Sequence, residues 1–265
     1  MTPRGSRKQK QTTLMGSHQR CWIWGRLPVM ETLRAGRWRP LEVRLDERLA
    51  AEERDEAFAQ AERLGADVSL LSGAALARLC HSEEHQGYVA KMPPFPYDAP
   101  VELLNSPSHP PFFVLLDAIQ DPFNFGAILR SADAFGVDGI FVGAAHQADV
   151  SSLVVRASSG AVNHVRLAQV EDLGEWIVRL RVEGVYVVGS APTAKRDVAQ
   201  ADFRKPTALV LGNEATGIRP QILELCDERV AIRQQGRVGS LNAAVAAGVL
   251  FYEVSRQRAK RGRDS

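Results

Sequence analysis

The residues that could do chemistry in this chain gather in two loops, each directly after a short apolar run. The first loop, 212–217, carries an asparagine and a glutamate between glycines and follows the uncharged run 207–211. Glycine there lets the backbone approach a ligand closely. The second loop, 233–239, is polar and follows the run 230–232. Ligands of open α/β sheets bind beyond the carboxyl ends of strands, so the loops predict a shared ligand site. The alternative is two turns whose polar residues only satisfy the backbone.

A further polar group follows the apolar run 112–116, which we predict to be a buried strand. It includes Asn124 and Arg130, and the arginine stands among apolar or small residues. The pattern predicts a helix over 127–135 that ends at Gly136. This group therefore also begins where a predicted strand ends.

The elements that must position these residues alternate between strands and helices. Further strands are predicted at 139–142, 165–167 and 185–190, and helices at 151–159, 171–183 and 241–254. Such alternation implies a parallel, doubly wound α/β sheet. The last helix, which Ser240 can cap, has an apolar stripe and small residues on its other faces, so we expect it to be buried.

A smaller α/β module, 21–92, precedes this region. Its predicted strands are 41–45, 68–71 and 85–90, and its predicted helices are 26–36, 50–64 and 73–79. The stretch from Met92 to Pro111 holds seven of the chain's fourteen prolines, which cannot propagate a helix or a central strand. We therefore expect an extended linker at 93–111.

The composition excludes several classes of protein. The chain has 265 residues, 45% of them hydrophobic and 24% charged, which is ordinary for one large or two small globular domains. Its three cysteines form no CxxC pair, which favours a reducing, cytoplasmic compartment. No apolar stretch is long enough to span a bilayer, and no secretory signal precedes the module. His81 and His85 are spaced like helical metal ligands, but the strand-like ending argues against zinc.

Motifs of several common enzyme sites are absent from the sequence. No predicted strand is followed by GxGxxG, which argues against a dinucleotide site or the commoner methyltransferase loop. No GxxxxGK[ST] or GxSxG is present either. Nucleoside-triphosphate hydrolysis and serine-based acyl transfer are therefore disfavoured.

Charge is distributed unevenly along the chain. Residues 1–20 carry a net charge of +5 and residues 255–265 carry +4, so the rest carries −7 in a chain of net charge +2. Basic tails on an acidic body favour a polyanionic partner, most simply nucleic acid. The alternative is a pair of solubilising ends, and we expect the first tail to be disordered.

Three motifs resemble those of the SpoU (TrmH-type) RNA ribose methyltransferases of the SPOUT superfamily. In order they are Asp117-x-x-x-Asp121-Pro122-x-Asn124-x-Gly126-Ala127-Ile128-x-Arg130-Ser131-Ala132, Leu211-Gly212-Asn213-Glu214-x-x-Gly217-Ile218, and Ile232, Gly236 and Ser240-Leu241-Asn242. Ala157-Ser158-Ser159-Gly160-Ala161 also fits, and the resemblance covers 112–254. The preceding module, with Gly25, Glu31 and His85-Gln86-Gly87, resembles the L30e-like substrate-binding domain of this family.

The resemblance implies a trefoil-knotted C-terminal α/β domain that binds S-adenosylmethionine. By the family pattern, cofactor contacts fall on Ala191, Leu211, Gly212, Ile232 and Leu241. The implied reaction moves a methyl group to a ribose 2′-hydroxyl of RNA. Ribosomal RNA is the first expectation, with a 23S-type RNA and a guanosine in mind, and tRNA is the alternative. A homodimer of the knotted domains is also implied, with no metal and no membrane.

The implied catalytic residues are Arg130, Asn124, Glu214, Ser240 and Asn242. The two asparagines and the serine can position groups by hydrogen bonds without competing for the methyl group. Glu214 either orients the loops or meets the methylsulfonium, and the alternative is a salt bridge that shapes its turn.

Arg130 is the family's usual catalytic residue and is often described as a general base. A guanidinium is charged at neutral pH, so we expect it instead to clamp phosphate and stabilise the developing alkoxide. The alternative is an ion pair with Asp117, Asp121 or Asp133.

Two departures from the family pattern bear on the substrate. Ala215 stands where many relatives have glycine, and Arg233-Gln234-Gln235 replaces a frequent Pro-Met pair and its follower. The cofactor loop meets these positions mainly through its backbone, so we expect cofactor binding to survive. An RNA-binding relative without catalysis and an unrelated small-molecule α/β enzyme are the alternative functions. The retained polar residues argue against the first, and the basic tails argue against the second.

Overall fold

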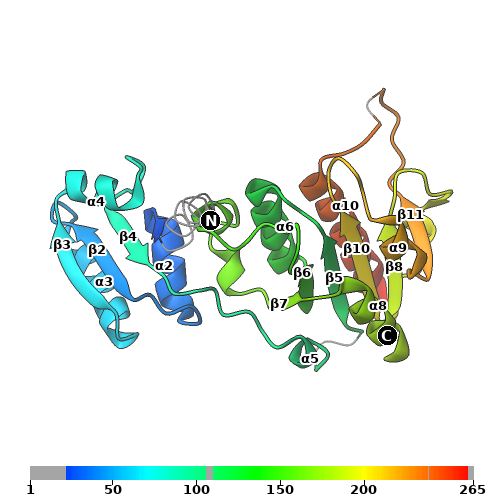
Figure 1. Cartoon of the computed structure of the whole chain (residues 1–265), viewed down its shortest axis with the longest axis horizontal. Coiled ribbons are helices and arrows are strands. Elements are labelled where there is room, and N and C mark those ends of the chain that lie inside the picture. The colour runs from blue at the N-terminus through cyan, green and yellow to red at the C-terminus, as the bar shows by residue number, and fades with distance from the viewer. Residues whose placement is uncertain (1–21, 106–109, 238, 262–265) are drawn as a thin grey trace, which may run out of the picture. The chain divides into compact units, whose positions relative to one another are not determined.

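The computed structural model describes residues 22–105, 110–237 and 239–261 (Figure 1). The predicted tail 1–20 and part of the predicted linker lie outside the described residues. The chain forms two compact units. Of the described residues, unit 1 comprises those up to Pro96 together with Asp149–Asn163, and unit 2 comprises those from Tyr97 to Ala148 and those from His164 onward. None of the described helices is long and apolar enough to cross a membrane.

Unit 1 is built on a four-stranded mixed sheet in the order β1-β4-β2-β3. Its elements are β1 (Trp22–Trp24), α2 (Arg26–Ala35), β2 (Glu42–Asp46), α3 (Ala51–Arg63), β3 (Asp67–Leu71), α4 (Gly73–Cys80) and β4 (Tyr88–Lys91). Six of these seven overlap elements expected from the sequence, and β1 was not predicted. The residues Leu33, Val43 and Leu45 are fully buried, which shows where the helices meet the sheet.

The start of α2 depends on a neighbouring turn. Gly25 has φ 100° and no side chain to cap the helix, and the Oε1 atom of Gln86 instead accepts a hydrogen bond from the Arg26 N–H at 2.9 Å. The turn itself is held by His85, whose Nδ1 accepts from the Gly87 N–H at 3.0 Å. His85 therefore serves the local backbone. Among the described residues, no group of three His, Cys, Asp or Glu could hold a metal ion.

The segment 149–163 packs within unit 1, although the sequence places it inside the predicted domain 112–254. It contains α7 (Ser152–Ala157) and the short helix η1 (Ala161–Asn163). Asn163 donates from Nδ2 to the Thr32 hydroxyl at 3.1 Å, and both side chains are buried. Periodicity predicts such a helix but does not reveal which surface its apolar face covers.

Unit 2 contains a seven-stranded sheet in the order β7-β6-β5-β10-β8-β11-β9, with every described pairing parallel. Its strands are β5 (Phe112–Asp117), β6 (Gly139–Gly143), β7 (Leu167–Val170), β8 (Tyr186–Ser190), β9 (Arg196–Asp197), β10 (Thr207–Gly212) and β11 (Glu228–Ala231). The predicted parallel α/β architecture is confirmed, although β7 begins two residues later than the expected strand 165–167. The trefoil knot stays a prediction.

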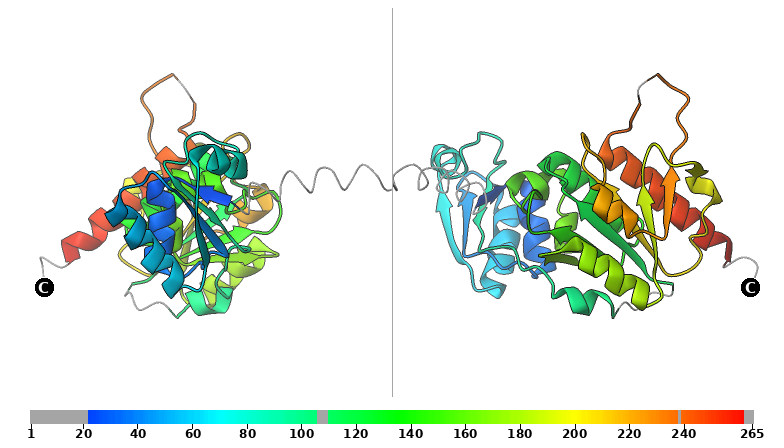
Figure 2. Two further views of the ribbon diagram at one scale, coloured as in Figure 1. Left: turned by 90° about the vertical axis from the view of Figure 1, so that its left-hand side faces the viewer. Right: turned by 45° about the vertical axis from the view of Figure 1, so that its right-hand side comes forward.

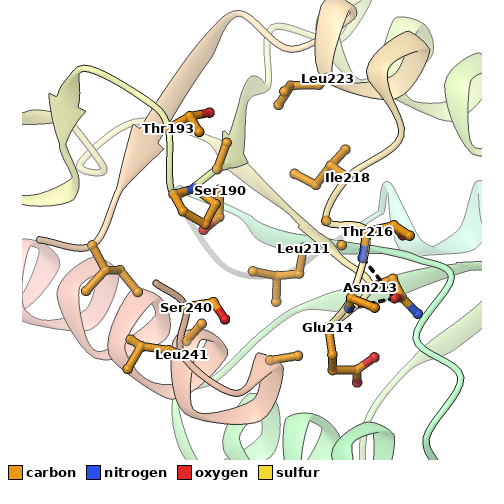
Figure 3. A pocket seen from close by; sticks show the side chains of 18 of the residues that line it. Ser190, Thr193, Leu211, Asn213, Glu214, Thr216, Ile218, Leu223, Ser240 and Leu241 are labelled. Atoms are coloured by element: carbon orange, nitrogen blue, oxygen red, sulfur yellow. Dashed lines mark hydrogen bonds between the residues drawn. The ribbon is translucent and has the colours of Figure 1, made fainter. Parts of the chain in front are cut away.

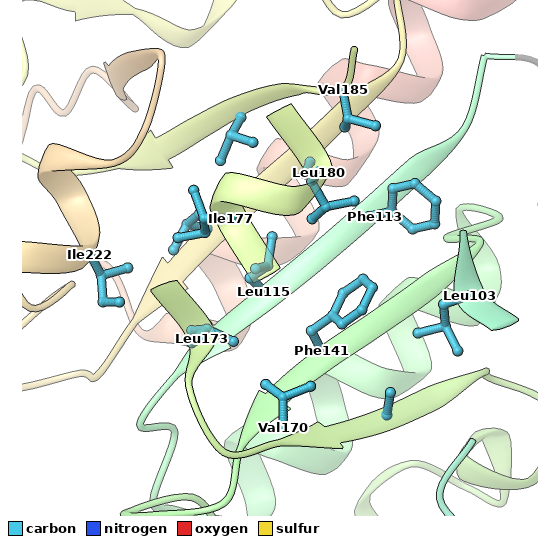
Figure 4. Packing of buried hydrophobic residues seen from close by; sticks show 14 of the residues in the cluster. Leu103, Phe113, Leu115, Phe141, Val170, Leu173, Ile177, Leu180, Val185 and Ile222 are labelled. Carbon is cyan, nitrogen blue, oxygen red and sulfur yellow. The ribbon is translucent and has the colours of Figure 1, made fainter. Parts of the chain in front are cut away.

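Helices cover both faces of this sheet (Figures 1 and 2). They are α5 (Pro100–Leu103), α6 (Pro122–Ala134), α8 (Leu173–Val182), the short η2 (Val198–Gln200), α9 (Pro220–Glu224) and α10 (Ala243–Arg261). On one face, Phe113 and Phe141 pack with Ile177 of α8 in a buried cluster (Figure 4). On the other face, the Phe112 ring meets Phe251 of α10 edge to face at 5.7 Å. Successive strand residues point to opposite faces, which explains this division.

Parts of the predicted linker and of the second predicted basic tail form helices in unit 2. Within the predicted linker, α5 begins with Pro100, which the first turn of a helix tolerates, and its Leu103 is fully buried. The last helix runs to Arg261, seven residues past the predicted end at Val254.

Arg258 explains why the last helix continues. Its half-buried guanidinium donates to the carbonyls of Pro110, Pro111, Phe203 and Lys205. Burial lowers the pKa of this guanidinium. A residue expected in a basic tail therefore holds together three separated segments of unit 2.

Candidate active site

A cavity of about 380 Å³ lies at the carboxyl ends of β8, β10 and β11 (Figure 3). The lining includes all five residues expected to contact a cofactor and two of those expected in catalysis: Ala191, Leu211, Gly212, Ile232, Leu241, Glu214 and Ser240. The carboxyl ends of parallel strands meet at one edge, so residues far apart in sequence converge there. The volume falls in the usual range for small-molecule sites.

Gly212 is required by the turn after β10. A Cβ atom at this position would stand 2.2 Å from the backbone carbon of Gly217 and 2.2 Å from the nitrogen of Ile218. The turn closes through two backbone bonds between Asn213 and Gly217, at 3.1 and 2.8 Å. Gly217 has φ 69°, a conformation that glycine adopts without a Cβ penalty. Both glycines that bracket this loop are therefore needed for its shape.

Asn213 connects this turn to the loop after β5, and its role was not predicted. Its Oδ1 atom accepts from the N–H groups of Ala215 at 2.8 Å and Thr216 at 3.2 Å (Figure 3). Its Nδ2 atom donates to the Ala118 carbonyl at 2.9 Å. Asparagine commonly bonds the backbone two residues onward, which was the available signal. Ala215 takes part here through its N–H.

The helix α6 begins at Pro122, five residues before the predicted start. Asp121 caps it by accepting from the N–H of Phe123 at 3.4 Å and of Asn124 at 3.0 Å, and proline at the first position fits this geometry. The first turn of α6 carries no apolar periodicity, so the sequence pattern did not predict it. The early start places Asn124 in the first turn of α6.

Three predicted catalytic residues form one hydrogen-bonded chain. Asn124 donates from Nδ2 to Glu214 Oε1 at 2.7 Å, and its Oδ1 accepts from Asn242 Nδ2 at 2.8 Å. These contacts assign both ends of the Asn124 amide. Within the described part of the chain, Glu214 makes no salt bridge, so its bond to Asn124 replaces the predicted alternative.

Arg130 does not reach the cavity of its own chain. It is exposed on α6, six residues after Asn124, which places it about 120° away around the helix axis. Asp117, one of the three partners in the alternative interpretation, is buried and accepts from the Arg219 Nε and N–H at 2.7 and 2.8 Å. Asp121 is occupied by its capping bonds. Arg130 therefore presents its charge to the surface of unit 2.

The loop after β11 contributes another side of the cavity. Ile232, Gln234, Ser240 and Leu241 line it, and Arg233–Arg237 are exposed. In the described residues between Arg233 and Leu241, only Arg233 makes a hydrogen bond or ion pair, to the Lys195 carbonyl and to Asp197.

The lining is suited to a molecule with apolar and polar parts. Leucine and isoleucine side chains lie beside backbone groups, amides and hydroxyls, with Glu214 as the carboxylate. The described lining residues include no Cys, His or Lys, so no strong nucleophile faces the space. Such a cavity can hold an electrophilic, positively charged ligand without reacting with it.

Comparison with known proteins identifies the class. Residues 111–252 match the model of the SpoU rRNA Methylase family, and residues 22–98 match that for RNA 2′-O ribose methyltransferase substrate binding. The first match covers more than half of the chain. The chain therefore belongs to the SpoU rRNA methylase family and is an RNA methyltransferase.

Individual relatives agree with this assignment. The chain is 37% identical to the 23S rRNA (guanosine-2′-O-)-methyltransferase RlmB of Shewanella oneidensis, over 82% of this chain and 87% of that one. It is 32% identical to the putative TrmH family tRNA/rRNA methyltransferase YacO of Bacillus subtilis, over 91% and 98%. The SpoU methyltransferase AviRb of Streptomyces viridochromogenes, solved with AdoMet, superposes with a TM-score of 0.75 at 29% identity, covering 97% and 95% of the two chains. S-adenosylmethionine is thus the cofactor of the family.

Proposed function

We propose that this protein transfers a methyl group from S-adenosylmethionine to a ribose 2′-hydroxyl of ribosomal RNA, at a guanosine of a 23S-type RNA. The observation that carries the proposal is the Asn124–Glu214–Asn242 chain beside a cavity free of competing nucleophiles. The name of the RlmB relative favours 23S rRNA. The name of the YacO relative keeps tRNA as the second candidate.

The cavity residues fit the cofactor in chemical type. Leu211, Ile232 and Leu241 offer apolar surface, and the Gly212 turn and Ala191 bring backbone to its edge. When bound, the cofactor supplies an electrophilic methyl group on a sulfonium. Glu214 supplies the negative charge that favours a cation at this site.

The chain's own polar residues would align the ribose oxygen. Transfer at carbon requires close, in-line approach, which fixed hydrogen-bonding groups promote. Asn124 is held from both sides, so its amide is already oriented. Ser240 and Asn242 lie on the adjoining loop and add donors that do not compete for the methyl group.

Arg130 completes the proposed site from a second copy of the chain. Three apolar side chains on α10 share one face at i, i+4 and i+7 and remain exposed, namely Val245 (53%), Val249 (38%) and Tyr252 (57%). Helix α6, which carries Arg130, packs beside α10. A two-fold dimer across this face would bury the apolar stripe and place Arg130 near the partner's cavity. There its charge would stabilise the developing alkoxide or clamp a phosphate.

Unit 1 is the proposed RNA-binding unit, as its match to a substrate-binding model suggests. RNA affinity depends largely on phosphate contacts and therefore on salt. The described cysteines Cys80 and Cys226 are free thiols, which supports a reducing, cytoplasmic setting.

Mapping ribose methylation in cells with and without the gene tests the function directly. Loss of one methylated ribose in 23S rRNA, restored by the purified protein with S-adenosylmethionine, is the expected result. Loss in tRNA would select the second candidate. An unchanged map, with RNA binding intact, would instead indicate a relative without catalysis.

A further inference from the structure

The loop after β5 contains a strained residue that sequence motifs do not explain. Ala118 has φ 62°, a left-handed conformation that residues with a Cβ atom rarely adopt. Strain of this kind persists only where surrounding contacts impose it, and it is concentrated at functional sites. Ala118 lies between the buried Asp117 and the Asp121 cap of α6, so the strain falls within the segment that leads to Asn124.

The contacts that impose this conformation come from a second loop, which follows β6. Gln147 Oε1 accepts from the Ile119 N–H at 3.0 Å, and the Ala148 N–H donates to the Ile119 carbonyl at 2.8 Å. Ile119 is fully buried between these bonds. His146, next to Gln147, is also left-handed, with φ 59°. Two strained loops are therefore fastened to each other at Ile119.

Gln147 contributes to this junction through one atom. Its Nε2 atom is buried and makes no hydrogen bond within the part of the chain that the structure describes. The side chain thus acts as an acceptor for Ile119. Asn213 holds the neighbouring Ala118 carbonyl from the other side, so the strained peptide is fixed between the loops after β6 and β10.

We infer that Gln147 is a positioning residue for methyl transfer: its side-chain oxygen holds the loop after β5 so that Asn124 meets Glu214 and Asn242. The inference rests on the proposed function. Gln147 does not touch the Asn124 amide and acts through the backbone of residues 118–121. Small displacements of aligned groups reduce rate more than affinity, so the effect belongs to the transfer step.

The test compares two replacements of similar length. Gln147→Met fills the space without a carboxamide oxygen, and Gln147→Glu keeps an oxygen within reach of the Ile119 N–H. We expect Gln147→Met to lower kcat on the order of tenfold or more, with the KM for RNA and the Kd for S-adenosylmethionine unchanged. Gln147→Glu should keep most of the kcat of the unmodified protein. A Gln147→Met enzyme with the kcat of the unmodified protein would overturn the inference.

A second-site change separates positioning from general damage. Glycine adopts φ near 62° without a Cβ penalty, so Ala118→Gly should restore part of kcat to Gln147→Met. In the otherwise unmodified chain, Ala118→Gly should raise the melting temperature, because strain is removed. A lower melting temperature there would overturn the strain argument even if Gln147→Met failed to fold. If the unmodified protein methylates neither ribosomal RNA nor tRNA, the proposed function fails. If the unmodified protein methylates one of them and Gln147→Met has the same kcat, only this inference fails.

Discussion

Two parts of the site around the cavity are built differently. We call the first the bonded wall, comprising 117–124 and 212–218, and the second the open wall, comprising 233–241 apart from residue 238. In the bonded wall, hydrogen bonds of side chains and of turn backbone connect the loop after β5 with the loop after β10. In the described open wall, contacts of this kind occur only at Arg233.

The difference indicates a division of labour within the site. The groups proposed to act in catalysis, Asn124 and Glu214, lie on the bonded wall. The open wall carries the departures from the family pattern at Arg233-Gln234-Gln235, where substrate-specific residues can vary without disturbing the fold. Asn242 follows the open wall and joins it to Asn124.

The largest contrast is expected between a glycine of each wall. Gly212→Ala places a Cβ atom 2.2 Å from backbone, whereas a Cβ atom at Gly239 meets nothing within 4 Å. We therefore expect Gly212→Ala to abolish binding of S-adenosylmethionine in calorimetry while unit 1 stays folded. Gly239→Ala should change the affinity by only about twofold, the size of an ordinary surface substitution. Equal affinities in both variants would remove the distinction between the walls.

Arg130 tests whether the proposed site is complete in one chain. Arg130→Ala should spare cofactor affinity and lower kcat on the order of a hundredfold, as loss of a charge-stabilising donor does. If the partner subunit supplies Arg130, mixing Arg130→Ala chains with Asn242→Ala chains should recover part of the activity. A monomer by light scattering would contradict the dimer, and near-normal turnover of Arg130→Ala would make the residue structural.

The residues of the bonded wall were easier to predict from the sequence than the long-range contacts that hold them. Apolar runs such as 207–211 predict buried strands, and the glycines at 212 and 217 predict a close turn. These patterns were enough to predict that Asn124, Glu214 and Asn242 belong to one site. The early start of α6 was missed because the Asp121 cap and the first-turn Pro122 carry no apolar periodicity. The contacts of Gln147 and of the segment 149–163 are long-range, and no local pattern specifies them.

Asn242 offers a smaller and cleaner test, because its two functions can be separated. Its Oδ1 atom, and not the predicted Ser240, caps α10 by accepting from the N–H of Ala244 and Val245, and its Nδ2 atom donates to Asn124. Asn242→Asp keeps the cap and loses the donor, so kcat should fall about tenfold, as for one hydrogen bond to a positioned group, with the melting temperature unchanged. Asn242→Ala should additionally cost about 1 kcal/mol of stability, the usual value of a helix cap. Equal stability losses in both variants would show that the donor bond, not the cap, stabilises the fold.

The smallest effects are expected at the two departures from the family pattern, Ala215 on the bonded wall and Arg233 on the open wall. Ala215 contributes its N–H to Asn213, and glycine would contribute the same group, so Ala215→Gly should change cofactor affinity by no more than about twofold.

Arg233 is exposed, and its contacts to Lys195 and Asp197 lie at the edge of the sheet. If it meets an RNA phosphate, Arg233→Ala should weaken RNA binding and reduce the slope of log K against log salt by about one. Cofactor affinity should stay unchanged. Filter-binding titrations at several salt concentrations measure this, and an unchanged slope would place Arg233 outside the RNA interface and limit the open wall to the cofactor.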